Sequence, residues 1–253
     1  MVTRRLSIPC ACLVVTLTDP VHCNGRDDGS PRSRERTNNP VPSPPPKDVG
    51  PLRIEVLDPS APTPTFVMRG GPRGPGRLVF LHGLCSHGLG YAQSFQWSAA
   101  QKGTLVAPQG DVPCAEKPFA RWSRDIEGLD DRVEGAYRAL GEVGLIDDVT
   151  VIGYSQGATR AEALARRYPD RYSRLVLIGG PEVPNPIGLT GVRAAVMMAG
   201  ERDNQEVMQE GAAAFRGAGI RTIFQSIPEA RHGQMGPRPE ETMGRALDWL
   251  WDD

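Results

Sequence analysis

The sequence has almost no net charge. Its 253 residues include 29 Lys and Arg against 30 Asp and Glu, which leaves a formal net charge of −1. This balance gives no electrostatic reason to expect a nucleic-acid partner or an anionic membrane surface. The length allows one large α/β domain or two small ones, and a hydrophobic content of 39% suits a globular core.

Histidine is also scarce. The chain has only His22, His82, His87 and His232. No group of histidine, cysteine and aspartate residues has the spacing of metal ligands, so we expect no metal site. A reaction that needs an imidazole base has few residues that can supply it.

The first 23 residues have the pattern of an export signal. A short basic start, Met1–Arg5, precedes the mostly apolar run Leu6–Thr18, which is too short to span a bilayer but fits the apolar core of a signal peptide. We therefore expect residues 1–23 to be a signal segment and the protein to be exported. The alternative is an irregular tail on a cytoplasmic protein. Val21-His22-Cys23 is similar to a lipoprotein cleavage box. Membrane attachment is expected only if Cys23 is lipidated.

Residues 24–51 differ in composition from the rest of the chain. This segment is charged and then rich in proline, ending in Pro42–Pro46, and it has almost no large apolar residue whose burial could offset the entropy of ordering. It is predicted to be a disordered linker. The folded domain is predicted over residues 52–253.

From residue 52 onwards, short apolar runs alternate with helical patterns. Paired strands are predicted at 53–57 and 65–69, followed by a hairpin turn at 70–76. Buried strands are predicted at 78–82, 105–107, 149–153, 175–178, 194–198 and 222–225, and helices at about 90–102, 127–142, 156–167, 205–217 and 239–251. This order predicts an α/β fold with a mostly parallel sheet covered by helices on both faces. Active sites in such sheets lie at the carboxyl ends of the strands.

A nucleophile motif follows the predicted strand at 149–153. Residues Gly153–Gly157 read GYSQG, and the helical run after them begins at once. G-x-S-x-G between a strand and a helix forms a tight turn that exposes the serine hydroxyl at its tip. A Cβ at either glycine would collide with the neighbouring strand or helix. Ser155 is therefore predicted to be a nucleophile, placed at a helix N-terminus that favours developing negative charge.

A serine hydroxyl is a weak nucleophile and needs an adjacent imidazole. His232 lies in the loop after the strand predicted at 222–225, where a base could reach back to Ser155. His82 directly precedes Gly83 and is interpreted as shaping that turn. His87, in the following loop, is a candidate substrate contact.

The predicted acid is Asp203, which follows the strand at 194–198. The order Ser155, Asp203, His232 is the nucleophile–acid–base order typical of this kind of sheet. Glu201 is the rival carboxylate, and an N-cap role is the structural alternative for Asp203. For the oxyanion, the backbone N–H groups of Leu84 and Gln156 are the predicted donors.

With these residues in place, the sequence resembles the α/β-hydrolase superfamily over about residues 53–251. Three segments are similar to the carboxylesterase, thioesterase and dienelactone-hydrolase group: Leu81–Leu84, Gly153–Gly157 and Gly200–Asp203. The resemblance implies a doubly wound sheet of about eight strands, an acyl-serine intermediate and no cofactor. Since little sequence separates the strands at 175–178 and 194–198, we expect no sizeable cap domain.

The leading hypothesis is a monomeric serine hydrolase that cleaves a carboxylic ester or thioester of small-molecule size. A serine peptidase of the same fold is the runner-up, and a catalytically idle binding domain is the alternative from another class. Trp122, near the strand ends, is a second candidate substrate contact beside His87.

The domain retains two cysteines, Cys85 and Cys114, in loops that follow the strands at 78–82 and 105–107. Both loops are expected at the same edge of the sheet, where a disulfide is geometrically possible and an oxidising compartment would close it. The sequence leaves a bridge and two unrelated thiols both open.

Overall fold

The computed structural model describes residues 52–252 with three gaps, at 58–60, 62 and 72–73. The predicted signal segment at 1–23, the linker at 24–51 and Cys23 lie outside the described residues, so these interpretations stay predictions. Within the described ranges, no helix is both long and apolar enough to cross a bilayer.

The centre of the domain is an eight-stranded sheet in the order β1-β2-β4-β3-β7-β8-β9-β10. The β1–β2 and β2–β4 pairs are antiparallel and every other pair is parallel. The strands are β1 (Ile54–Leu57), β2 (Thr65–Met68), β3 (Gly76–Leu81), β4 (Gly103–Pro108), β7 (Val149–Tyr154), β8 (Tyr172–Ile178), β9 (Ala194–Gly200) and β10 (Arg221–Ile227). The predicted mostly parallel sheet of about eight strands is confirmed.

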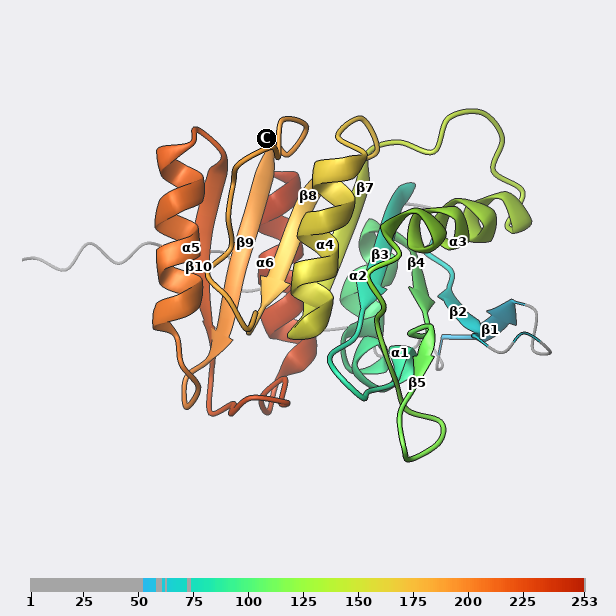
Figure 1. Ribbon diagram of the computed structural model, residues 1–253, viewed down its shortest axis with the longest axis horizontal. Helices are drawn as coiled ribbons and strands as arrows, with labels where there is room; N and C mark the ends of the chain where they lie inside the picture. The colour runs from blue at the N-terminus through green and yellow to red at the C-terminus, as the bar shows by residue number, and fades with distance from the viewer. Residues whose placement is uncertain (1–51, 58–60, 62, 72–73, 253) are drawn as a thin grey trace, which may run out of the picture. The chain divides into compact units, whose positions relative to one another are not determined.

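Helices cover both faces of this sheet (Figure 1). One face packs against α3 (Ile126–Ala139), α4 (Gln156–Arg167) and α5 (Glu206–Gly217), and the other against α1 (Gly88–Ala92), α2 (Gln96–Lys102) and α6 (Pro239–Trp251). A hydrophobic core lies on each side of the sheet, and successive residues of one strand point alternately into the two cores. In β3, Val79 and Leu81 face the first group of helices, whereas Leu78 and Phe80 face the second. Double burial explains why the strands read as continuous apolar runs.

Two sequence-based expectations about this region need correction. The single helix expected at 90–102 is divided into α1, the 3₁₀ turn Gln93–Phe95 and α2. The expected hairpin turn at 70–76 is wrong, because β2 and β3 do not pair but lie on opposite sides of β4. The connection instead packs against the start of β4, where a Cβ on Gly103 would lie 1.8 Å from Gly76 O. Glycine is required there for close backbone approach, not for a hairpin.

The segment between β8 and β9, residues 179–193, contains turns but neither helix nor strand. All of it lies within the described part of the chain, and it agrees with the expectation of no sizeable cap. No cap therefore lies between β8 and β9 at the carboxyl edge of the sheet.

Candidate active site

Ser155 lies at the sharp turn between β7 and α4, at the carboxyl edge of the sheet. Its backbone is in a left-handed conformation, with φ 51° and ψ −116°. Such a conformation costs a non-glycine residue about 1–3 kcal/mol and persists only where surrounding structure imposes it. Here Ser155 N donates a 2.8 Å hydrogen bond to Ile178 O of the neighbouring strand. The predicted tight turn between strand and helix is confirmed.

The two glycines of the motif make this turn possible. A Cβ on Gly157 would lie 2.0 Å from Leu81 O, and a Cβ on Gly153 would lie 2.4 Å from Gly157 O. Both distances are far below van der Waals contact, so the helix could not start so close to the strands with any other residue. The sequence-based reason for glycine at both positions is confirmed.

The structure brings Ser155, His232 and Asp203 into one hydrogen-bonded chain. His232 Nε2 lies 3.2 Å from Ser155 Oγ, and His232 Nδ1 lies 2.9 Å from Asp203 Oδ2. The side chain of His232 is 52% exposed, whereas that of Asp203 is 19% exposed. The three residues come from the ends of β7, β9 and β10, which meet because parallel strands end at one edge.

The rival acid points elsewhere. Glu201 Oε2 accepts a 2.8 Å hydrogen bond from Glu229 N, which ties the β9 loop to the loop after β10. Nor is Asp203 the N-cap of α5, because Gln205 occupies that position. Asp203 Oδ1 accepts a hydrogen bond from Asn204 N, and its Oδ2 is left for the imidazole. Geometry therefore favours Asp203 over Glu201.

Gly179 lies beside the imidazole, in a backbone conformation that favours glycine. Its φ is +53°, and a Cβ there would lie 3.4 Å from two atoms of the His232 ring and 3.7 Å from Asp203 Oδ2. The end of β8 thus forms a flat backbone surface against which the ring packs. Sequence reasoning did not single out this residue, although a glycine that directly follows a buried strand at the carboxyl edge is a usable signal.

The loop after β3 lies against Ser155. A Cβ on Gly83 would lie 3.3 Å from Ser155 Cβ, so glycine lets the loop approach closely. Within the described part of the chain, the N–H groups of Leu84 and Gln156 have no hydrogen-bond acceptor. Both donors are therefore free to bind an incoming oxygen.

The loop after β3 is held in place by the neutral side chain of His82. His82 is fully buried, and burial lowers its pKa to about 4. Gly110 N donates to His82 Nε2 at 2.8 Å, so the ring proton is on Nδ1, which donates to Gly83 O at 2.7 Å. The C=O and N–H of a trans peptide point in opposite directions. Holding Gly83 O against the His82 ring therefore turns the Leu84 N–H away from that ring.

Trp122 is also part of this buried layer, and its interpretation as a substrate contact is corrected. It is 3% exposed, its ring lies 4.7 Å from that of His82, and its Nε1 donates a 2.7 Å hydrogen bond to His82 O. The indole thus packs inside the fold because its N–H finds a backbone acceptor there. Its backbone is held by Gln156, whose side chain bonds both Trp122 N and Trp122 O.

His87 caps α1, since its Nδ1 accepts a 3.2 Å hydrogen bond from Leu89 N. Partial burial lowers its pKa. Its ring also lies 4.9 Å from that of Phe66. This local role explains its position, and a contact with substrate stays a prediction.

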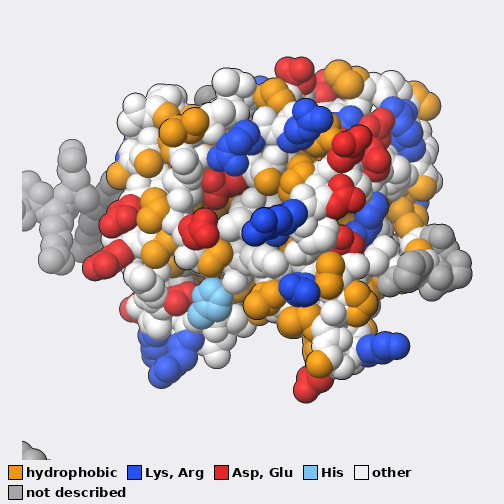
Figure 2. Space-filling view, viewed as in Figure 1, with side chains coloured by type: hydrophobic (Ala, Val, Ile, Leu, Met, Phe, Trp, Pro, Cys, Tyr) orange, Lys and Arg blue, Asp and Glu red, His pale blue; other side chains and the backbone are white. Residues whose placement is uncertain are grey.

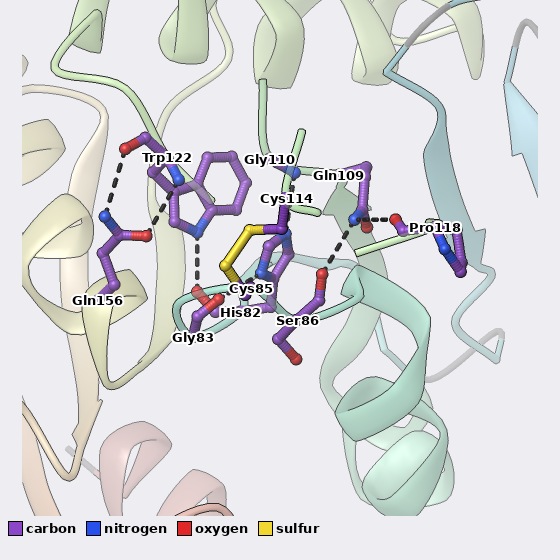
Figure 3. The surroundings of a disulfide bond; sticks show 10 residues. All are labelled: His82, Gly83, Cys85, Ser86, Gln109, Gly110, Cys114, Pro118, Trp122 and Gln156. Carbon is purple, nitrogen blue, oxygen red and sulfur yellow. Dashed lines mark hydrogen bonds between the residues drawn. A yellow bond between two sulfur atoms is a disulfide. The ribbon is translucent and has the colours of Figure 1, made fainter. Parts of the chain in front are cut away.

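Cys85 and Cys114 form a disulfide with a Cα–Cα distance of 5.6 Å (Figure 3). The bond joins the loop after β3 to the small hairpin of β5 (Val112–Pro113) and β6 (Ala120–Arg121), which was not predicted. Ser86 and Ala120 exchange two backbone hydrogen bonds beside the disulfide. The alternative of two unrelated thiols is excluded by this geometry.

Gln109 completes the brace and was missed by sequence reasoning. Its side chain accepts from Gly88 N and donates to Ser86 O and Pro118 O, so one amide links the loop after β3 to the segment between β5 and β6. Figure 3 shows the bonds to Ser86 and Pro118. A polar residue directly after a buried strand was the available signal. Sequence reasoning also missed Tyr91 and Tyr154, two tyrosines near His232.

Solved structures with the same architecture were found, but no family model matches the sequence, and no curated protein matches it. The fluorophosphonate-binding serine hydrolase F of Staphylococcus aureus matches with a TM-score of 0.61 and 15% identity, over 81% of this chain and 100% of that one. A carboxylesterase of Mesorhizobium loti matches with a TM-score of 0.57 and 19% identity, over 79% and 99%. Acyl-protein thioesterase 2 of Zea mays matches with 0.52 and 18%, over 74% and 96%.

The chain has the α/β-hydrolase fold. The predicted resemblance is thereby confirmed for the architecture, which these structures share over nearly their whole length. In the α/β-hydrolase fold the carboxyl edge of the sheet carries the site, and this is where Ser155, Asp203 and His232 lie.

Proposed function

We propose that the protein is a serine hydrolase that cleaves carboxylic esters or thioesters, with Ser155 as nucleophile, His232 as general base and Asp203 as the acid. The observation that carries this proposal is the continuous hydrogen-bonded chain from Ser155 Oγ through His232 to Asp203 Oδ2. Nucleophile, base and orienting acid within hydrogen-bond reach are the arrangement that nucleophilic acyl transfer requires.

In the first half of the reaction, His232 Nε2 accepts the proton of Ser155 Oγ as the oxygen attacks the carbonyl carbon. The C–O or C–S bond to the leaving group then breaks, and the imidazolium returns the proton to the leaving alcohol or thiol. Asp203 holds the Nδ1–H and stabilises the positive charge on the ring. The products of this half are the acyl-serine ester and the free leaving group.

The negative charge on the carbonyl oxygen is stabilised by the N–H groups of Leu84 and Gln156. Both are free of acceptors within the described residues, and Gly83 brings the first of them close to Ser155. One such donor is worth about 3 kcal/mol in the transition state. The start of α4 adds its positive end at the same place.

In the second half, water attacks the acyl-serine carbonyl while His232 accepts its proton. The imidazole is 52% exposed, so water can reach it. Collapse of the tetrahedral intermediate returns the proton to Ser155 Oγ and releases the carboxylic acid. The substrate, water and the side chains of the site account for every bond made and broken in this cycle, so the proposed reaction needs no cofactor.

The surroundings of the site support a small-molecule substrate with apolar parts. Leu84 is 59% exposed and Phe119 is 39% exposed, on the two segments that the disulfide joins. In the view of Figure 2, hydrophobic side chains are exposed beside a histidine in the lower part of the molecule. The names of the structural neighbours, carboxylesterase and acyl-protein thioesterase among them, support the same bond types. The proposal needs neither nucleic acid nor a second copy of the chain.

We also propose that the protein is exported. After export it is either released in soluble form or anchored by a lipid on Cys23. The Cys85–Cys114 disulfide supports this location, because such bonds close in oxidising compartments and are rare in the cytosol. Mass spectrometry of the mature N-terminus from the native cell tests the proposal. A chain that retains Met1 or starts within the first few residues contradicts it.

Labelling by a fluorophosphonate probe, together with an ester panel, tests the enzymatic function. The wild-type chain is expected to incorporate one probe molecule at Ser155 and to turn over p-nitrophenyl and thioester substrates. The matched Ser155→Ala chain should do neither. Cleavage of amides at comparable rates would instead indicate a peptidase. An unlabelled and inactive wild-type chain would indicate the idle binding domain.

A further inference from the structure

We propose that Tyr91 and Tyr154 are positioning residues that hold the imidazole of His232 in register with Ser155. The proposal rests on the function proposed above, in which Ser155 is the nucleophile and His232 is the general base. Its structural basis is a pair of hydroxyl groups that hydrogen-bond both backbone polar groups of Gly233, the residue directly after His232.

The two contacts are complementary. Gly233 N donates a short hydrogen bond to the hydroxyl of Tyr154, and the hydroxyl of Tyr91 donates to Gly233 O at 2.9 Å. Gly233 has a φ of +86°, a left-handed conformation that glycine adopts without strain. Bonding its N–H and its C=O fixes the peptide groups on both sides of its Cα, and the first of these is the peptide that follows His232.

The two rings support each other. Tyr91 and Tyr154 stack with centroids 4.8 Å apart and planes inclined by 17°. The ring of Tyr154 also lies 5.7 Å from the imidazole of His232. Burial raises the pKa of Tyr154 to about 12, so its hydroxyl is neutral over the pH range in which a serine hydrolase works. A buried neutral hydroxyl is a well-defined partner for a backbone N–H.

His232 lies within a turn in which Gln234 N donates to Arg231 O and Arg231 N donates to Gln234 Oε1, but neither bond involves the peptide between His232 and Gly233. The side chain of His232 is half exposed, and it lies in the loop between β10 and α6, where Glu229 and Gly236 also have positive φ. The ring itself is held by Asp203 on one side and meets Ser155 on the other. A displacement of about 1 Å at a reacting group can lower a rate by about 100-fold.

Tyr91 and Tyr154, with their hydrogen bonds to Gly233, are called the clamp below. The clamp also connects three parts of the site. Tyr154 directly precedes Ser155, Tyr91 lies on the helix that follows the loop of Leu84, and Gly233 directly follows His232. A movement of any one part is therefore resisted by the other two. The two tyrosines therefore link the residue before Ser155 to the residue after His232.

Conservative variants test the proposal. Tyr154→Phe and Tyr91→Phe keep the rings but remove one hydrogen bond to Gly233 each, and Tyr168→Phe, at the far end of α4, is the matched control. With p-nitrophenyl acetate we expect kcat to fall about 10- to 100-fold in each clamp variant, with KM within about twofold of wild type. The double variant should lose less than the product of the two single losses, because both bonds restrain one residue.

A spectroscopic measurement follows the same alignment without turnover. The low-field proton resonance of His232 Nδ1–H, bonded to Asp203, should be sharp in the wild-type and Tyr168→Phe chains and broadened or lost in the clamp variants. It is also measured in Ser155→Ala, so the clamp is tested even if Ser155 proves not to be the nucleophile. Unchanged resonances together with kcat within twofold of wild type in both clamp variants would overturn the proposal. Equal losses in Tyr168→Phe would do so as well.

Discussion

The two sides of the site are built differently. The side that carries the proposed oxyanion donors, called the oxyanion side below, consists of residues 82–88 with 109–122. It rests on the buried side chains of His82, Gln109 and Trp122 and is cross-linked by a disulfide. The base side, residues 200–204 with 228–236, carries the half-exposed imidazole of the proposed base, which is held by hydrogen bonds and by contacts with Gly179 and Tyr154, with no disulfide in this part of the described chain. The comparison teaches how the two tasks differ. Donors to an oxyanion work best when they do not reorganise, whereas a base must meet water and exchange its proton.

The largest effects are expected where the two sides meet. Ser155→Ala and His232→Ala should each lower kcat for a p-nitrophenyl ester by about 10⁴- to 10⁶-fold, because the groups act as one unit. The double variant should be little worse than either single one. Circular dichroism and thermal unfolding check that the fold is intact. Activity near the wild-type level in either folded single variant contradicts the mechanism.

The base side is sharpened by its two carboxylates. Asp203→Asn should lower kcat by about 10³- to 10⁴-fold, because it disturbs the imidazole tautomer and removes the charge that stabilises imidazolium. Glu201→Gln is the matched control and should lose little activity, since that carboxylate bonds Glu229 N instead. Steady-state kinetics decides between them, and a reversed order would reassign the acid to Glu201.

The oxyanion side is broken by His82→Phe. This variant keeps a buried ring but loses the bonds to Gly83 O and Gly110 N. We expect kcat to fall by about 100-fold as the Leu84 N–H loses its fixed orientation. The unpaired N–H of Gly110 should cost about 1–3 kcal/mol of unfolding free energy. Urea titration and ester kinetics measure both effects, and unaltered kcat would remove His82 from the positioning of this loop.

A smaller effect on activity is expected from the disulfide. Replacing Cys85 and Cys114 together by serine should lower the unfolding free energy by about 3 kcal/mol, since the bond closes a loop with a sequence separation of 29. Because Gln109 and the Ser86–Ala120 bonds remain, kcat should fall only about fivefold. Denaturation of the wild type with and without reductant should reproduce the shift, and the double variant should not respond to reductant. A wild type equally stable in both conditions would contradict the role of the bond.

The one expected effect that is followed by stability alone, without kinetics, is a pH dependence of unfolding. The folded-state pKa of His82 is about 4 against 6.5 for an ordinary histidine, so the unfolded chain takes up the proton first as the pH falls. Stability from neutral His82 is complete above pH 6.5 and is lost as the pH falls towards 4, by about 3 kcal/mol. The difference between wild type and His82→Phe, followed by urea titration over this range, isolates this residue from other titrating groups. A constant difference would argue against a neutral buried imidazole.

The sequence by itself determined the alternation of strands and helices, the turn at Ser155 and the positions of His232 and Asp203 at strand ends. These features are local: double burial produces apolar runs, and a tight strand-to-helix turn requires glycine at 153 and 157. The function of the site follows from the same residues and stays a proposal that the experiments above decide.

Only the tertiary structure decided which groups meet across the chain. The placement of β4 between β2 and β3, the choice of Asp203 over Glu201 and the burial of Trp122 each depend on partners far away in the sequence. The stacked Tyr91 and Tyr154 lie 142 and 79 positions from the glycine that they bind. No periodicity or motif records such pairs, because a hydrogen bond between distant residues depends on how the loops converge at the edge of the sheet.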